Sequence, residues 1–455
     1  MMGLKSHRPP TVLGLVFRKN CGLDEEASWR MPFQLSAKWT SRFVLNRDAF
    51  GVKRTSESPR INGVFSPMNQ ETNLKCDSLP SLPLSITIAH CERLQRPPRK
   101  RMTGKSDHIV AELAARIFAD LADPQTVNRA RNGVWKAPFW RALSAASLPL
   151  AWVPEQLGGA GASLADGFAT LGVAGRFAVA VPLAETLIAG WLLARAGLKA
   201  PNGPMTIAPN WPSDRIIFGK DATLSGRASG VPFASEAQNI AVLAQGEAGV
   251  VVALVSTSDC IIDERQNLAG DPSNIVQFER VKPSQHARVP SGFDHALMLM
   301  GSVSRSVQTA GALESILSLT VSYANERVAF ERPIGKFQAV QQNLARLAGE
   351  TAAALAVSGS AANTIAESDG FDETTFLEAA SAKIRCAEAA TEGAAIAHQV
   401  FGAIGFTKEH VLHRFTLRML GWRDDFGSES YWAAELGRHV AQRGAEEFWP
   451  MVAAR

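Results

Sequence analysis

A long apolar helical pattern in the second half of the chain ends at a short charged turn. The turn runs from Arg327 to Arg332, and Pro333 and Gly335 then prevent the helix from continuing. A second amphipathic helix begins near Phe337. The segment therefore predicts two helices joined by a tight connection. Because a guanidinium is a planar set of donors that matches phosphate oxygens, we expect this helix end to contact a pyrophosphate and the sugar beside it.

The rest of the chain changes from helical to strand-like patterns and back again. Residues 106–200 are rich in Ala and Leu and are mostly helical by pattern. Short Val and Ile runs, separated by Gly, Ser, Asp and Pro, follow in residues 204–288 and are typical of a small β domain. Because the breaks between the remaining helices are short, they should form an antiparallel bundle. These helices are expected at residues 294–327, 337–366, 372–400 and 408–445.

These changes predict an α+β fold that is mostly α. We expect an N-terminal helical domain at residues 102–203, a middle β domain at residues 204–290 and a C-terminal four-helix bundle at residues 291–455. Residues 1–101 show no sustained period of 2 or 3.6. For this extension we expect disorder or poor order, or a native chain whose translation starts at Met102.

A clean helix should follow the extension directly. Ser106 or Asp107 is expected to cap its first turn. Apolar residues recur at every fourth position after the cap, and this spacing predicts the helix. The recurring residues are Ile109, Leu113, Ile117 and Leu121.

The charge and the cysteine content exclude several classes of protein. Residues 1–101 hold 17 Lys and Arg against 8 Asp and Glu, whereas the remaining residues hold 30 against 35. The main body is therefore mildly acidic, which gives no support to a role in binding nucleic acid. The five cysteines include no Cys-x-x-Cys pair, and no apolar run approaches the ~20 residues that span a bilayer. We expect a reduced, cytoplasmic protein without a membrane span.

Three ordered motifs resemble signatures of the acyl-CoA dehydrogenase family. The segment from Arg327 to Gln338 is similar to the family pattern Arg-x-x-Phe-Gly-x-Pro-Ile-x-x-Phe-Gln, with Glu331 in place of the Gly. Residues 153–161 resemble the N-terminal entry motif, and residues 379–383 with 398–406 resemble the last two C-terminal signatures. The resemblance covers roughly residues 106–440. It implies a helical domain, a small middle β-barrel domain and a C-terminal four-helix bundle.

The resemblance implies FAD as the cofactor, bound across a subunit interface. The matching residues would touch the adenosine half of an FAD that the neighbouring chain mainly holds. Ala403 replaces one glycine of this set, and the family segments Thr-Glu-Pro-x-Ala-Gly-Ser-Asp and Trp-Ile-Thr/Ser, which contact the flavin ring and the substrate, are not found. Trp211-Pro212-Ser213 is not a convincing substitute. The candidate cofactor-binding residues are Arg327, Phe330, Phe337, Gln338, Gln399, Gly402 and Gly405.

The catalytic carboxylate of the family has no evident match. In the family reaction a Glu removes the α-proton of an acyl-CoA thioester while the β-hydride passes to the flavin. Most members carry it in a Tyr-Glu-Gly-Thr turn, where this chain has Phe426, and a minority carry it in the first bundle helix, at about Gly301 here. Asp425 and Glu429 are the candidate substitute bases, with Asp424 nearby. Solvation is the simpler interpretation of acids in such a turn.

The resemblance predicts an FAD-dependent subunit that dehydrogenates a hydrophobic acyl-CoA thioester in lipid metabolism. An electron-transfer flavoprotein or a similar acceptor would take the electrons. The departures from the family pattern resemble the branch in which unlike chains pair and act on steroid- or ring-derived thioesters. Two alternatives stay open: a non-catalytic subunit that completes the FAD site of a partner, and a flavin-free scaffold with the same fold. The chain would form a homo- or hetero-oligomer, a dimer or tetramer, with another chain of this kind.

Three histidines raise the question of a metal site. His410 and His413 lie three residues apart on an expected helix, with His398 before them. A metal would need a further ligand, so surface or capping roles are the simpler interpretation. We expect no metal.

Overall fold

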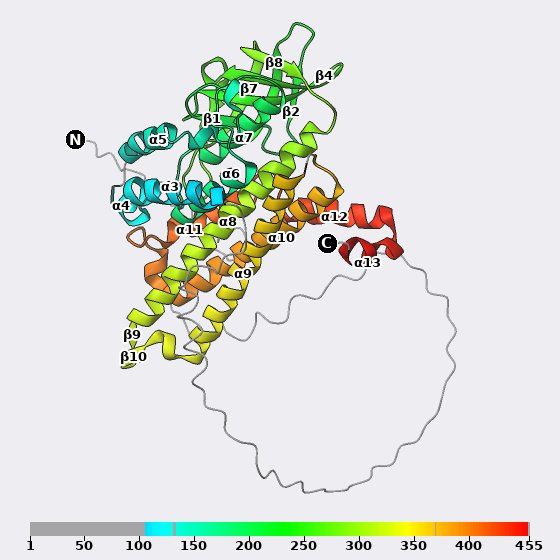
Figure 1. Cartoon of the computed structure of the whole chain (residues 1–455). Helices are drawn as coiled ribbons and strands as arrows, with labels where there is room; N and C mark the ends of the chain where they lie inside the picture. The colour runs from blue at the N-terminus through cyan, green and yellow to red at the C-terminus, as the bar shows by residue number, and fades with distance from the viewer. Residues whose placement is uncertain (1–104, 131–132, 369, 454–455) are drawn as a thin grey trace, which may run out of the picture. The chain divides into compact units, whose positions relative to one another are not determined.

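The computed structural model describes residues 105–130, 133–368 and 370–453, and the predicted extension at residues 1–101 lies outside them. Helices are followed by strands and then by long helices, so the predicted α+β, mostly helical fold class is confirmed (Figure 1). The boundaries of the predicted domains stay predictions.

The helix predicted after the extension is present as α3 Lys105–Ala122. Phe118 on α3 is fully buried and packs edge-on against Phe139 of α5 Lys136–Ala145, with ring centroids 4.9 Å apart. Ala114 and Ala122 lie on the same inward face. Three of the residues whose spacing predicts the helix are 66%, 43% and 38% exposed, namely Ile109, Leu113 and Leu121. Both sets have the same spacing, and aromatic packing decides which of them faces the core.

The bounds of these helices follow the sequence closely. Helix α6 begins after Ser163, whose hydroxyl accepts from the Asp166 amide in a capping box. Helix α3 begins at Lys105, so the predicted caps lie inside its first turn. The described α-helices before the sheet are α3 Lys105–Ala122, α4 Pro124–Ala130, α5 Lys136–Ala145, α6 Leu164–Phe177 and α7 Leu183–Arg195.

The middle region is one sheet whose strands pair in the order β6-β7-β3-β2-β4-β5-β8, with β1 parallel to β4. Among the described residues no pairing joins the edge strands β6 and β8, so the sheet is open where a barrel was expected. Both edge strands are only three or four residues long, which limits further pairing. The strands are β1 Met205–Ala208, β2 Arg215–Phe218, β3 Leu224–Pro232, β4 Asn239–Gly246, β5 Gly249–Ser256, β6 Ile261–Asp263, β7 Ser273–Val281 and β8 Gln285–Arg288.

The central strands are buried on both faces, which explains their continuous apolar runs. Leu243 and Leu254 join the core that α7 shares with the sheet. Val242 and Ala253, at neighbouring positions, point into a second cluster on the other face. The sheet therefore contributes to two separate hydrophobic clusters, one on each face.

Three long helices follow the sheet and run side by side (Figure 1): α8 Phe293–Glu326, α9 Gln338–Glu367 and α10 Glu373–Phe401. Helices α8 and α9 are joined by the short strands β9 Val328–Ala329 and β10 Arg332–Pro333. None of the described helices is long and apolar enough to cross a membrane.

The predicted fourth helix at residues 408–445 is broken, which corrects the sequence analysis. Helix α11 Leu412–Trp422 packs against α8 and α10, and a turn then interrupts the helix before α12 Glu429–Arg443 and α13 Ala445–Ala453. The break is set by left-handed backbone at Phe426 and Gly427, with φ values of 54° and 92°. Ser428 then caps α12 by accepting from the Tyr431 amide at 3.3 Å.

Candidate functional site

The two positions at which the family resemblance places the base lie against each other. Gly301 is on α8, and Phe426 is in the turn between α11 and α12. A Cβ added to Gly301 would lie 2.2 Å from Cγ of Phe426. Phe426 is completely buried, and the Trp432 indole donates to its carbonyl at 2.9 Å. Neither position can deliver or accept a proton.

The first candidate base, Asp425, is already occupied by structural contacts. Its Oδ1 accepts from Nδ2 of Asn210 at 3.0 Å, and its Oδ2 accepts from Nε of Arg305 at 2.9 Å. Its side chain is 18% exposed. Glu429, the second candidate, lies half-buried in the first turn of α12. In the described part of the chain its side chain has no hydrogen bond or ion pair, so it is the freer of the two acids.

Arg305 is the centre of a buried ionic network. Its Nη2 donates to Glu185 of α7 at 2.5 Å and its Nη1 donates to Gln308 at 2.7 Å. Burial by itself lowers the pKa of Arg305, but the charges of Glu185 and Asp425 outweigh this and raise it. Burial raises the pKa of Glu185, and the Arg305 charge opposes that shift. Because a guanidinium keeps its proton, we treat the group as a buried ion pair with a second carboxylate.

A buried lysine holds the same turn from α10. The Lys383 ammonium donates to the carbonyl oxygens of Trp422 and Asp425 at 2.9 and 2.7 Å. Its side chain is nearly inaccessible, and burial lowers the pKa of Lys383 to about 7. Lys383 is the last residue of the matched motif at residues 379–383, so the structure gives that motif a role in fixing the turn.

The loop after β1 contributes residues that the sequence analysis missed. Asn210 is fully buried and donates to the carbonyl of Gly230 as well as to Asp425. Trp211 covers Gly230 so closely that a Cβ there would lie 2.4 Å from its Nε1. Ser213 and Asp214 lie four and five residues after Pro209, which is the spacing between Pro and Ser-Asp in the family segment Thr-Glu-Pro-x-Ala-Gly-Ser-Asp. That spacing was the available signal for the segment that the sequence analysis did not find.

The first group of predicted cofactor residues lies on the surface at the far end of α8. Arg327 and Gln338 are exposed, and in the described part of the chain their side chains have no hydrogen bond or ion pair. Phe330 is 89% exposed at the tip of the β9–β10 hairpin. Phe337 is half-buried, and the guanidinium carbon of Arg332 lies over its ring, 4.3 Å from the ring centroid.

The second group lies beside the first. Tyr323, one turn before Arg327, stacks on Phe401 with ring centroids 4.4 Å apart, and this contact joins the ends of α8 and α10. Gln399 is exposed, and Gly402 has a φ of 64° with open space where a side chain would be. Gly405, in the 3-10 helix η7 Gly402–Phe406, is buried instead. Free amides, a free guanidinium and an open glycine fit the pyrophosphate and adenosine half of FAD.

This surface is far from the inner site, by which we mean Gly301, Asp425 and Phe426 with the side chains that hold them. Gly301 and Arg327 are 26 positions apart on one continuous helix, which corresponds to roughly 39 Å at 1.5 Å per residue. The structure brings together the two predicted cofactor segments, and it separates both of them from the candidate bases.

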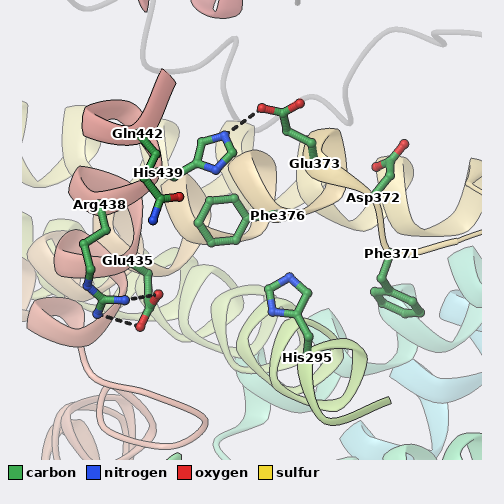
Figure 2. Close-up of a pocket in the computed structure, with 9 residues that line it drawn as sticks. All are labelled: His295, Phe371, Asp372, Glu373, Phe376, Glu435, Arg438, His439 and Gln442. Atoms are coloured by element: carbon green, nitrogen blue, oxygen red, sulfur yellow. Dashed lines mark hydrogen bonds and ion pairs between the residues drawn. The ribbon is translucent and has the colours of Figure 1, made fainter. Parts of the chain in front are cut away.

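A pocket of about 340 Å³ opens between α8, α10 and α12 (Figure 2). Phe376 lies at its centre between His295 and His439, with ring centroids 5.8 and 5.3 Å away. His439 pairs with Glu373 at 2.6 Å, and burial lowers the pKa of His295. The walls of this pocket contain aromatic rings and paired charges, and none of the predicted site residues lines the pocket. Its lining is His295, Phe371, Asp372, Glu373, Phe376, Glu435, Arg438, His439 and Gln442.

The three histidines of the sequence analysis have local partners. His398 contacts the Thr416 hydroxyl at 3.0 Å, and His413 contacts the carbonyl of His410 at 2.7 Å. Among the described residues no group of three or more His, Cys, Asp or Glu side chains could hold a metal ion.

Comparison with known proteins shows similarity to acyl-CoA dehydrogenases in sequence and in fold. Residues 294–436 match the model of the acyl-CoA dehydrogenase C-terminal domain. The chain is 28% identical to acyl-CoA dehydrogenase IpdE2 from Mycobacterium tuberculosis over 78% of this chain and 98% of that protein. It resembles the ChsE4-ChsE5 complex from M. tuberculosis with a TM-score of 0.69 and 23% identity, covering 76% of this chain and 100% of that one. It resembles the steroid ACAD Tcur3481-Tcur3483 with a TM-score of 0.66 and 25% identity, covering 74% and 98%.

Proposed function

We propose that the chain is the non-catalytic subunit of a heteromeric acyl-CoA dehydrogenase, a proposal supported by the match of residues 294–436 to that family's C-terminal domain and by the similarity to acyl-CoA dehydrogenase IpdE2. It would complete the FAD site of a partner chain and leave the removal of the α-proton to that partner. The partner would carry a Glu at the position that matches Phe426 or Gly301.

One observation carries this proposal. A base must touch the α-carbon of the thioester, so it must line a space that the substrate can enter. Phe426 is completely buried, and its ring fills the space beside Gly301. Asp425, next to it, has both carboxylate oxygens engaged by Asn210 and Arg305. The absence of a carboxylate, and of space for one, at Gly301 and Phe426 supports a partner chain as the source of the base.

The exposed surface at the end of α8 supports the second half of the proposal. Arg327 and Gln338 would hold the pyrophosphate and ribose, and Phe330 would pack beside the adenosine, with Gln399 and Gly402 completing the surface. Because this surface is roughly 39 Å along α8 from the inner site, the FAD that it touches would have its reactive ring in another chain. Bound FAD supplies a two-electron acceptor for the hydride.

The similar solved structures support a pair of unlike chains. Two of them carry the names of two chains, ChsE4-ChsE5 and Tcur3481-Tcur3483, and the second is called a steroid ACAD. By this likeness the assembly would act on a bulky, ring-derived acyl-CoA thioester and pass electrons to an electron-transfer flavoprotein or a similar acceptor.

Absorbance at 450 nm tests the proposal. The chain is purified alone and after co-expression with a family member that carries the catalytic Glu. We expect a colourless chain alone, and a yellow complex that an acyl-CoA panel bleaches. A chain that is yellow and is bleached without a partner would refute the proposal. A preparation that is colourless in every combination would favour the flavin-free scaffold.

A second candidate function is dehydrogenation by this chain itself. One observation favours it: Glu429 lies half-buried in the first turn of α12, and in the described part of the chain its side chain has no hydrogen bond or ion pair. In that case Glu429 is the better base, since Asp425 is already paired. Glu429→Gln should then abolish bleaching by acyl-CoA, whereas Glu446→Gln, at an exposed position on α13, should not.

A further inference from the structure

The guanidinium of Arg305 joins three segments that meet at the inner site. Glu185 comes from α7, Gln308 comes from α8, and Asp425 comes from the turn. The side chains of Arg305 and Glu185 are 3% and 2% exposed. Each nitrogen of the guanidinium donates to one of these side chains. Arg305 is therefore an internal tie in which all three guanidinium nitrogens are engaged by side chains.

The contact with Asp425 also determines where the next residue lies. Asn210 holds Asp425 from the other side, and its carbonyl accepts from the Phe426 amide at 3.2 Å. Gly301, which faces the Phe426 ring, is one helical turn before Arg305 on the same side of α8. Two residues one helical turn apart on α8 therefore act together: Gly301 provides the surface for the Phe426 ring, and Arg305 provides the charge that holds Asp425.

We propose that Arg305 is the positioning residue that keeps the inner site of this chain closed. It fixes the Asp425 side chain, and this contact keeps the Phe426 ring on Gly301. The inference rests on the proposed function, because closure excludes an acyl group from this chain and leaves the partner's site to react. Lys383 holds the same turn, but it contacts only main-chain oxygens and does not direct the Asp425 carboxylate.

Hydrogen exchange measured by mass spectrometry on the full chain tests this role. The first variant is Arg305→Met combined with Glu185→Met, which removes the fully buried pair and leaves the 18% exposed side chain of Asp425 held by Asn210 alone. The matched control is Arg418→Met combined with Asp271→Met, another buried pair with two 2.7 Å contacts between α11 and the sheet region. A milder variant, Asp425→Asn, keeps the shape of the side chain and weakens the charged contact with Arg305.

We expect the peptide that covers residues 423–428 to exchange about tenfold faster or more in the Arg305 variant, as follows from losing a charge-assisted hydrogen bond. Asp425→Asn should change it in the same direction by less. Helices α8 and α10 should keep their protection in both. The proposal is overturned if the peptide stays as protected as in the parent, if the control opens it equally, or if exchange rises uniformly over the chain.

The outcome is independent of the flavin experiment. Exchange is measured on the chain without a partner, so a negative result for Arg305 does not affect the proposal that the end of α8 binds FAD. A colourless complex, together with faster exchange of residues 423–428 in the Arg305 variant, would refute the FAD proposal and support the positioning role of Arg305.

Discussion

The ring of Phe426 occupies the space that a side chain on Gly301 would need, with Cγ 2.2 Å from the position of an added Cβ. The resemblance presents these positions as two separate places for a base. The fold joins them into one volume, and a single aromatic ring fills it. A carboxylate at Gly301 would have to displace this ring, and a carboxylate at position 426 would have to replace it.

Gly301→Ala tests that contact directly. We expect a loss of ~1–3 kcal/mol in the free energy of unfolding, because the added methyl group overlaps a fully buried ring. Gly349→Ala on α9 is the control, since nothing lies within 4 Å of its added Cβ, and it should stabilise by about 0.5–1 kcal/mol. Thermal and urea denaturation measure both. Equal effects of the two variants would show that Phe426 yields easily.

Arg327→Ala tests the FAD surface in the complex with a partner. Removing a charge-assisted contact worth ~1.5–3 kcal/mol should weaken FAD binding about tenfold or more. The thermal midpoint of the isolated chain should not change, because Arg327 is exposed. Arg346→Ala, which removes an exposed arginine paired with Glu392 on the bundle, is the control. An unchanged FAD titration in Arg327→Ala would place this side chain in solvent.

Glu331→Gly should stabilise the chain by ~1 kcal/mol. Phe330 and Glu331 both have left-handed backbone, with φ values of 51° and 65°, at the tip of the β9–β10 hairpin. A two-residue hairpin turn of this kind favours glycine, which is the residue that the family pattern has at position 331. Glu331→Ala keeps the Cβ and should give no gain. A gain in the alanine variant would point to the Glu331 charge as the cause.

Acid should weaken the packing around η7. The pKa values of His398, His410 and His413 are all lowered, chiefly by burial. The unfolded chain therefore binds protons below a pH of about 6.5 while the folded chain resists them. The stability is fully present above that pH and is lost as the pH falls through the lowered values. The thermal midpoint should drop between pH 7 and pH 5.5, and less so in His398→Gln. An equal drop in that variant would remove His398 from the explanation.

The local motifs were predictable because they depend on neighbours in the chain. The helices α8, α9 and α10 begin and end within one or two residues of their predicted limits, since Pro333, Gly335 and the periodic apolar residues mark them. The helical pattern missed the break at residues 423–428, and only the family resemblance placed a turn there. No proline marks the break, and the Phe426 backbone is held by Asn210 from the loop after β1 and by Trp432 of α12.

The sequence by itself determined the resemblance to the acyl-CoA dehydrogenase family, the order of helices and strands, and the absence of an acid at the two positions where that resemblance places the base. Residue identity and spacing carry these properties. Only the tertiary structure decided that Asp425 is tied to Arg305, that Gly301 and Phe426 fill one space, and that Tyr323 stacks on Phe401 where α8 and α10 end. These are contacts between residues far apart in the chain. Tertiary packing determines which residues form these contacts, and the local sequence pattern does not contain that information.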